Sequence, residues 1–353
     1  MLYGIPPSAK AYARLKPIRD ALGPDSLSFL IDHPAQLHNF ILDPKYHEDA
    51  PVPIFVKVDV GYHRAGLEPE TKSLETLLEA IAHSQKSTGP PHIKLIGFYS
   101  HNSLSYAAGS PEESMRYLAE ELDRCSQAAK QASELGIVDE RLTISIGATP
   151  TTAAVQNLSV ESEPSQRVHQ MLESLSEVFQ VEIHAGNYPF LDMQQLVTHS
   201  RPLKSEDGPT MTNKDIAFRV LAEVLSVYTE REVPEALVGA GTLALGREPC
   251  KAYPGWGVIA PSMWNTGSEE QIWNEDEKIG WTVGRISQEH GVLTWSGPSD
   301  RARQFRIGEK VTIYPNHACI SAAGFSWFLV VDSSLEGERG SKIVDVWLRC
   351  RGW

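Results

Sequence analysis

The sequence predicts an α/β first half, built on a parallel sheet or barrel, and an all-β second half. Up to about residue 200, short β-rich runs alternate with longer amphipathic stretches, which is the pattern of repeated βα units. From Ile216 onward, strand-like runs are separated by Gly, Pro, Asp and Asn, and few helical periods appear. A chain of 353 residues is long enough for two such domains.

In the first half, each predicted strand is followed by a predicted helix, so that about six βα units can be counted. In order, the strand and helix pairs are 2–5 with Ser8–Leu22, 26–32 with a helix starting at His33, 53–60 with 70–84, 93–100 with 111–136, 142–147 with 149–156, and 179–188 with 189–197. The segment 157–166 is predicted to be a polar surface excursion.

In the second half, the predicted strands are 217–230, 236–241, 281–295, 309–315, 327–332 and 342–349, and the segment 313–324 also has the pattern of a strand. We therefore expect a barrel-type domain over 1–200, a linker over 201–215 and a β domain over 216–353.

Composition excludes several classes of protein. The net charge of -13 argues against a nucleic-acid partner, which favours a basic face. The four cysteines are scattered and have no disulfide-framework spacing, which indicates a reducing, cytoplasmic setting. No apolar run is long enough to span a membrane, and the first residues lack the plan of a signal peptide. We expect a soluble cytoplasmic protein without a membrane partner.

A histidine and a cysteine lie two residues apart in the segment "IYPNHACISAAG". If this segment is a strand, His317 and Cys319 share one face and could hold one metal ion between them. The alternative is a buried cysteine beside a histidine that has its hydrogen bonds satisfied. Two protein ligands are also one fewer than catalytic zinc sites usually have.

The predicted strands of the first half end in polar residues, and the carboxyl ends of barrel strands are where functional residues gather. "GATPTT" has features of a phosphate-binding loop, with Gly147 and the hydroxyls of Thr149 and Thr151 at a helix start, or it is an ordinary helix cap. "HAGNY", with Gly186 and Asn187, offers backbone donors to an anion or is a turn.

These motifs together resemble one known family. "FVKVDVGYHRAG", "YSHNSLSY", "IGATPT", "HAGNYPFLD" and "PNHAC", in this order, are similar to segments of the eukaryotic D-serine dehydratases, most closely the fungal members. Their superfamily includes D-threonine aldolase and the N-terminal domain of alanine racemase, the fold-type III pyridoxal phosphate enzymes. The resemblance covers essentially the whole chain and implies a (β/α)8 TIM-type barrel followed by a β domain.

The resemblance also implies which residues bind each cofactor. By motif, Thr149, Gly186 and Asn187 would bind the phosphate of pyridoxal 5'-phosphate, and Tyr99 and Tyr106 would contact the same cofactor. Arg64 would contact the hydroxyl group of the cofactor ring, or would contact a residue that binds the cofactor. His317 and Cys319 would be the ligands of Zn2+, since substrate and water complete the coordination. The aldolase relatives have Asp where Cys319 stands, and a thiolate favours zinc over a harder ion such as manganese.

The implied reaction converts D-serine to pyruvate and ammonia. The pyridoxal cofactor acts as an electron sink, and zinc acts as a Lewis acid on the departing hydroxyl. We expect a small D-amino acid as substrate, D-serine or also D-threonine, and a homodimer at full length. The alternatives are a D-threonine aldolase-like lyase and a non-catalytic protein that only binds pyridoxal phosphate.

One family feature is missing from this sequence. The Schiff-base lysine of the family lies on the first barrel strand in a segment resembling "RPHVKTHK", and residues 1–353 contain no such segment. Lys57 belongs to a different motif and is no substitute. The six predicted strands are also fewer than the eight of a closed barrel of this type. We therefore expect an N-terminally truncated chain, lacking about two βα units, that has no catalytic lysine and is inactive as given.

Overall fold

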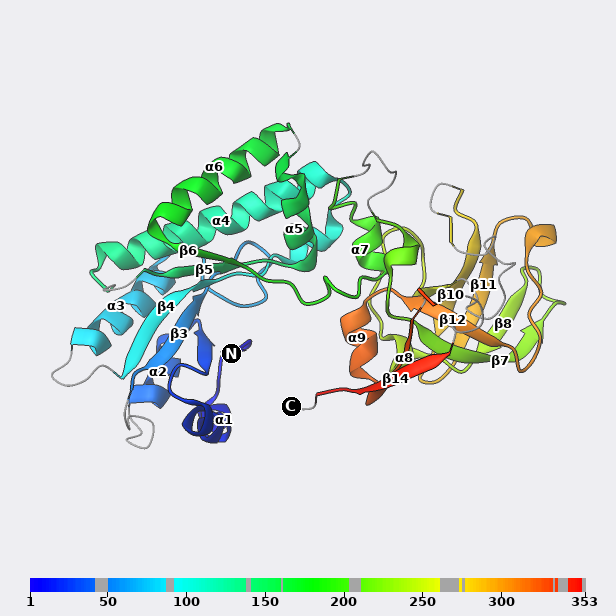
Figure 1. Ribbon diagram of the computed structural model, residues 1–353, viewed down its shortest axis with the longest axis horizontal. Coiled ribbons are helices and arrows are strands. Elements are labelled where there is room, and N and C mark those ends of the chain that lie inside the picture. The colour runs from blue at the N-terminus through cyan, green and yellow to red at the C-terminus, as the bar shows by residue number, and fades with distance from the viewer. Residues whose placement is uncertain are drawn as a thin grey trace. The chain divides into compact units, whose positions relative to one another are not determined.

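The structure is a computed structural model that describes residues 1–41, 50–86, 92–137, 141–159, 161–202, 211–260, 273–274, 277–332, 334–335 and 342–350 (Figure 1). Contacts divide the chain into two compact units. Unit 1 comprises Met1–Ala185 and His199–Pro202, and unit 2 comprises Gly186–Thr198 and Leu203–Trp353. The domain limits expected from the sequence, at residues 200 and 216, stay a prediction.

Unit 1 is built on a six-stranded parallel sheet whose strands follow one another in chain order. They are β1 (Leu2–Tyr3), β2 (Ser28–Ile31), β3 (Val52–Lys57), β4 (Ile93–Tyr99), β5 (Thr143–Ile146) and β6 (Gln180–Ile183). The register pairs Lys57 with Tyr99 and Tyr99 with Ser145, so the carboxyl ends of β3, β4 and β5 lie side by side. This sheet, followed by a β domain, confirms the predicted fold class.

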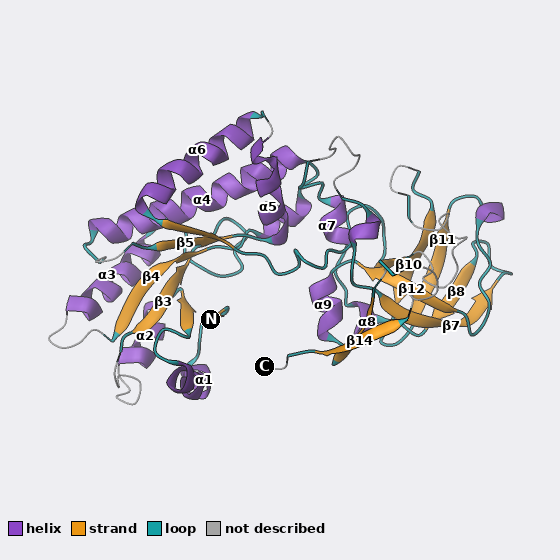
Figure 2. Cartoon of the chain, viewed as in Figure 1, coloured by secondary structure: helices purple, strands orange, loops and turns teal. Residues whose placement is uncertain are grey.

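The helices of unit 1 connect consecutive strands, and Figure 2 shows α3 to α6 along the sheet. They are α1 (Ala9–Leu22), α2 (Pro34–Ile41), α3 (Lys72–Lys86), α4 (Pro111–Glu134), α5 (Thr149–Ala154) and α6 (Glu163–Val178), with short 3-10 helices at Ser103–Ala107 and Val155–Ser159. Ser110 caps α4 by accepting a hydrogen bond from Glu113 N, and Pro111 follows it in the first turn. An apolar stripe of α4 that includes Leu118 and Leu122 is fully buried.

The prediction for 157–166 is wrong in its second part, because α6 begins at Glu163. Ser162 accepts a hydrogen bond from Ser165 N, and Pro164 lies in the first turn. Serine and proline are common in turns and also favour the start of a helix. The same residue types therefore fit both structures, and the helix that follows was missed.

Unit 2 contains a closed antiparallel barrel with the strand order β10-β11-β8-β7-β12-β9. Its strands are β7 (Val220–Tyr228), β8 (Glu235–Val238), β9 (Gly257–Ile259), β10 (Gly280–Ile286), β11 (Gly291–Ser296) and β12 (Lys310–Pro315). Val224, Trp281 and Ile313 are among the buried side chains that fill its core. A separate hairpin pairs β13 (Trp327–Val331) with β14 (Ile343–Leu348).

In the part of unit 2 that the structure describes, the barrel is accompanied by the short helices α7 (Met193–Val197), α8 (Thr242–Leu245) and α9 (Ala318–Ala323), with 3-10 turns at Asn213–Asp215 and Ser299–Arg301. The prediction that 313–324 is one strand is wrong, because β12 ends at Pro315. His317 is the N-cap residue of α9, and Cys319 lies in its first turn. The side chains of His317 and Cys319 therefore do not lie on one face of a strand, as the sequence had predicted.

Within the described part of the chain, none of the helices has both the length and the apolar character needed to cross a membrane.

Candidate functional site

Three side chains from different strands meet at the carboxyl edge of the sheet in unit 1. Lys57 ends β3, Tyr99 ends β4 and His184 directly follows β6. The Lys57 ammonium nitrogen lies 4.4 Å from the centroid of the Tyr99 ring. The Tyr99 and His184 rings stack with centroids 4.3 Å apart and an angle of 7° between their planes. The strand ends therefore form a cation–aromatic–imidazole stack.

Burial sets the ionisation of this stack. It lowers the pKa of Lys57 to about 8, with a further contribution from the charge of Arg64. Burial also lowers the pKa of His184 to about 4, helped by the Lys57 charge. The pKa of Tyr99 is raised to about 12, first by burial and then by the Glu121 carboxylate. At neutral pH, Lys57 is therefore mainly an ammonium, His184 a neutral imidazole and Tyr99 a phenol.

His184 has one ring nitrogen that the surrounding residues do not satisfy. Its Nδ1 lies 3.1 Å from Ser145 Oγ, and that hydroxyl donates to Glu182 Oε1 at 2.7 Å. The serine oxygen therefore accepts from Nδ1–H, which leaves the lone pair on Nε2. Nε2 of His184 and Nδ2 of Asn102 are both buried and have no hydrogen-bond partner among the described residues. Such orphaned polar atoms at the strand ends are suited to a polar ligand.

Glu121 on α4 ties the strand-end loops together and was missed by the sequence analysis. Its side chain is 0% exposed. Oε1 accepts hydrogen bonds from Ser100 Oγ at 2.9 Å, Asn102 N at 3.0 Å and Gly147 N at 3.2 Å, and Oε2 accepts from Thr151 Oγ1 at 2.8 Å. One carboxylate thus holds the loops after β4 and β5. The available signal was an acidic residue on the apolar face of a predicted helix.

The predicted phosphate loop is only partly available for a ligand. Gly147 has φ +140°, and a Cβ there would lie 2.1 Å from the carbonyl oxygen of His184, so a side chain is excluded. Thr149 is buried at the start of α5. The Thr151 hydroxyl is already engaged, since it donates to Glu121 and accepts from Ala148 N.

The remaining predicted cofactor residues are distributed over both units. Tyr106 is partly buried in the 3-10 helix after β4, and Arg64 is exposed in the loop after β3. Gly186 and Asn187 belong to unit 2, whereas Thr149 belongs to unit 1. Their meeting around one phosphate group stays a prediction.

The predicted metal ligands lie at the amino end of α9 in unit 2. The His317 side chain is 14% exposed, and its Nδ1 lies 2.7 Å from Gln194 Oε1. Cys319 is an exposed free cysteine whose Sγ lies 4.0 Å from the place a Cβ on Gly186 would occupy. Burial lowers the pKa of His317, which favours the neutral ring. Partial burial and the Asp192 carboxylate raise the pKa of the Cys319 thiol.

Asp192 fixes the position of this helix end. It is the N-cap of α7, where its Oδ1 accepts from Gln195 N at 2.9 Å, and its Oδ2 accepts from Ala318 N at 2.8 Å. It also accepts a hydrogen bond from Asn187 Nδ2. Burial raises the pKa of Asp192 to about 7. A single buried carboxyl therefore caps two helix starts and places the backbone that carries His317 and Cys319.

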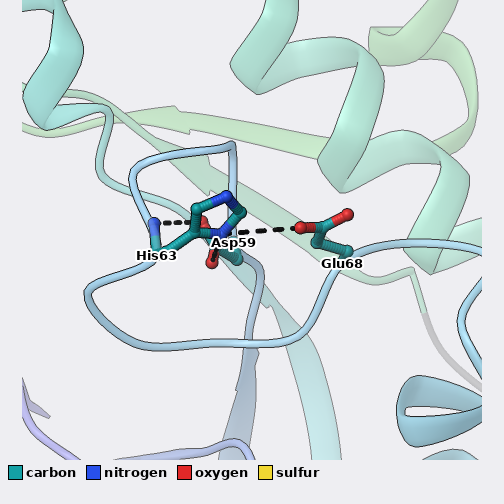
Figure 3. A group of neighbouring side chains, drawn as sticks. All are labelled: Asp59, His63 and Glu68. Carbon is teal, nitrogen blue, oxygen red and sulfur yellow. Dashed lines mark hydrogen bonds and ion pairs between the residues drawn. The ribbon is translucent and has the colours of Figure 1, made fainter.

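A second group of side chains, Asp59, His63 and Glu68, could in principle hold a cation (Figure 3). Asp59 Oδ1, however, already accepts from Gly61 N at 2.9 Å and His63 N at 3.1 Å, and Oδ2 lies 3.0 Å from His63 Nδ1. Burial opposes ionisation of Asp59, but these donors outweigh it and lower the pKa of the carboxyl. We interpret this group as the closure of the loop after β3.

Comparison with known proteins adds independent findings. Residues 217–331 match the family described as "Putative serine dehydratase domain", and residues 13–162 match "Alanine racemase, N-terminal domain". A D-serine dehydratase of Schizosaccharomyces pombe is 33% identical over 357 residues, which cover 100% of this chain and 74% of the relative. A D-serine dehydratase of Saccharomyces cerevisiae is 30% identical over 303 residues, which cover 85% of this chain and 63% of the relative.

Solved structures show the same fold. The solved structure of D-threo-3-hydroxyaspartate dehydratase from Delftia sp. HT23 superposes with a TM-score of 0.72 and 23% sequence identity, covering 100% of this chain and 79% of the other. An alanine racemase-like protein from Idiomarina loihiensis gives the same TM-score of 0.72 at 22% identity. At this identity, the likeness establishes the architecture alone.

Proposed function

Because the chain belongs to the D-serine dehydratase family, of the fold-type III pyridoxal phosphate lyases, we propose that its site serves the conversion of D-serine to pyruvate and ammonia. We further propose that this reaction depends on pyridoxal 5'-phosphate and Zn2+. The observation that carries the proposal is the His317 and Cys319 pair at the start of α9, since an imidazole and a cysteine thiolate are zinc-type ligands.

The carboxyl edge of the unit 1 sheet fits a pyridoxal cofactor. Two buried polar atoms there, His184 Nε2 and Asn102 Nδ2, have no partner among the described residues, and the flat Tyr99 ring stacks on the His184 ring. Thr149, Tyr106, Gly186 and Asn187 complete the proposed set of binding residues. Pyridoxal phosphate, when bound, supplies an electron sink for the α-carbon of the substrate.

The side chains of this edge would orient anionic groups. Lys57 is 6% exposed and mainly protonated at neutral pH, and Arg64 lies in the loop that follows the same strand. Both are cations, so they favour binding of a phosphate or a substrate carboxylate. His184 stays neutral and offers an acceptor at Nε2, while the Tyr99 hydroxyl stays protonated and can donate.

The donor set of His317 and Cys319 fits zinc better than manganese, since a thiolate is a soft ligand. Zinc, when bound, would polarise the hydroxyl group that leaves the substrate. A D-threonine aldolase-like activity is the alternative within the superfamily. D-threonine separates the two activities, since a dehydratase releases 2-oxobutanoate and ammonia from it, whereas an aldolase releases glycine and acetaldehyde.

We test the function with a chain extended at its amino end by a segment carrying the family's "HVKTHK" sequence, supplied with both cofactors. We expect pyruvate from D-serine, and no acetaldehyde from D-threonine. Acetaldehyde without 2-oxobutanoate would replace the dehydratase assignment by the aldolase one. A cofactor-loaded extended chain that releases neither product would favour a protein that only binds the cofactor. The homodimer and the cytoplasmic location expected from the sequence stay predictions.

Zinc binding gives the first prediction. Purified wild-type protein is expected to retain about one zinc ion per chain, and Cys319→Ala to lose most of it, because the thiolate is one of two protein ligands. Metal content after gel filtration is the measurement. Cys350→Ala is the matched control, since Cys350 is also an exposed free cysteine. Equal zinc in the wild type and Cys319→Ala would exclude this site.

Cofactor attachment gives the second prediction. Free pyridoxal phosphate is expected to bind residues 1–353 without a specific borohydride-reducible link to Lys57. The reason is that this amine is buried and lies over the Tyr99 ring. Peptide mass mapping after reduction at pH 7 and pH 9 is the measurement, with the exposed Lys72 as an internal reference for nonspecific labelling. Labelling of Lys57 above that reference, most visible above its pKa of about 8, would contradict the prediction.

A further inference from the structure

We propose that Gln194 is the positioning residue that sets the tautomer of His317, with the proton on Nδ1 and the metal on Nε2. The inference rests on the proposed zinc site and adds a residue to it. Gln194 is the second residue of α7, and it precedes His317 by 123 residues in the sequence. Both belong to unit 2, so one compact unit contains the whole arrangement.

The orientation of the Gln194 amide follows from a contact that does not involve histidine. Its Nε2 lies 2.7 Å from the backbone carbonyl oxygen of Pro249. A carbonyl oxygen can only accept, so the NH2 end of the amide must point to Pro249. The opposite end, Oε1, is then the atom that lies 2.7 Å from His317 Nδ1. Because an amide oxygen also only accepts, Nδ1 must carry the proton, and the lone pair is on Nε2.

Among the described residues, the Asp192 carboxylate is a further acceptor near this nitrogen, but the distance is too long for a hydrogen bond. Its Oδ2 lies 3.7 Å from His317 Nδ1. The same oxygen accepts from Ala318 N and from Asn187 Nδ2. Asp192 therefore places the helix end, whereas Gln194 holds the ring.

The backbone next to His317 is fixed as well. Gln194 N donates to the carbonyl oxygen of Asn316 at 3.0 Å. The Asn316 side chain is buried, and its Nδ2 donates to the carbonyl oxygens of Glu248 and Gly255, each at 2.8 Å. Gln194 thus contacts both the ring of His317 and the residue before it. The ring is oriented before any ion arrives, and such outer partners typically contribute about 10–100-fold to metal affinity.

The test compares zinc affinities of the full 353-residue chain, measured by competition with a chromophoric chelator. Gln194→Leu removes the acceptor at similar size, and we expect its zinc dissociation constant to rise by about 10–100-fold. Gln194→Glu keeps an acceptor oxygen for Nδ1 but loses the donor to Pro249 O, so we expect an affinity between those of the wild type and Gln194→Leu. Gln288→Leu, the same change at an exposed position of unit 2, is the control and should leave zinc binding unchanged.

A second readout needs neither metal nor activity. In metal-free protein labelled with 15N-histidine, the two-bond couplings of the His317 ring report its tautomer, and loss of the signal in His317→Asn assigns it. We expect the Nδ1–H form in the wild type and in Gln194→Glu, and a mixture in Gln194→Leu.

The outcomes separate this inference from the zinc site itself. Wild-type zinc binding together with an unchanged affinity and tautomer in Gln194→Leu would overturn the role of Gln194 and leave the zinc site standing. A His317 ring in the Nε2–H form in Gln194→Glu would also overturn it, because an acceptor for Nδ1 is still present in that variant. A wild type that binds no zinc would overturn the proposed site and this inference with it.

Discussion

Residues 1–353 alone, supplied with zinc and pyridoxal phosphate, are expected to release no pyruvate from D-serine above the rate without protein. The resemblance assigns proton transfer at the α-carbon to a lysine in a "HVKTHK"-like segment, and the chain contains no such segment. Positioned proton transfer by a side chain typically contributes about 10²–10⁴-fold to the rate. Lys57 lies at the carboxyl edge of the sheet, where the cofactor is proposed to bind, but its ammonium nitrogen is held over the Tyr99 ring.

The matched experiment extends the same chain by an amino-terminal segment that carries the family lysine. We expect turnover from this extended chain, and none when its added lysine is replaced by alanine. Zinc content and cofactor absorbance are recorded for all three proteins, so that loss of binding is not mistaken for loss of catalysis. Robust pyruvate formation by residues 1–353 alone would show that the lysine segment is dispensable.

Replacing the buried carboxylate of Glu121 is expected to have the largest effect on unit 1. Glu121→Leu removes the acceptor shared by Ser100 Oγ, Asn102 N and Gly147 N. Each buried donor left without a partner costs about 1–3 kcal/mol. We therefore expect local stability around the loops after β4 and β5 to fall by at least about 3 kcal/mol. Binding of pyridoxal phosphate should weaken in parallel.

Glu121→Gln is the control for that change. Its amide oxygen can keep the three donors, while its NH2 group can donate to the Thr151 hydroxyl, which has Ala148 O as its other acceptor at 3.2 Å. We expect a loss of only about 1 kcal/mol. Hydrogen exchange at the amides of Asn102 and Gly147 measures the local opening free energy of these loops in both variants. A local measurement is needed because a chain with two compact units does not have to unfold in one step. Equal exchange rates in the two variants would show that hydrogen bonding to Glu121 does not hold the loops.

The alternation of strands and helices in the first half could be predicted because each βα unit carries its own local pattern. Helix α6 was missed because its start, with Ser162 and Pro164, has the composition of a turn. The segment around His317 was predicted as a strand, since short runs of small apolar residues fit either structure. The first N–H group of this helix donates to Asp192, a residue 126 positions earlier in the chain, and such a partner cannot be identified from the local sequence.

The hydrogen-bond partners of the site residues could not be predicted from the sequence either, because they also lie far away in the chain. Glu121 on α4 meets loops 19 to 30 residues away, and Gln194 meets His317 across 123 residues. Such contacts are set by the packing of the whole unit. A sequence pattern can identify a residue that is unusual for its position, such as an acidic residue on the apolar face of a helix. It does not identify what that residue binds.

The position of α7 in the chain affects the order in which unit 2 can fold during synthesis. Residues 186–198 belong to unit 2, the chain then returns to unit 1 for residues 199–202, and it re-enters unit 2 at Leu203. During synthesis, Asp192 and Gln194 leave the ribosome more than a hundred residues before His317 does, so α7 must wait for its partners. Closing so long a loop is slow compared with forming local contacts. Zinc binding at the proposed site of His317 and Cys319 would therefore be a late marker of folding, and a fragment limited to residues 217–331 would contain both proposed ligands without Asp192 and Gln194.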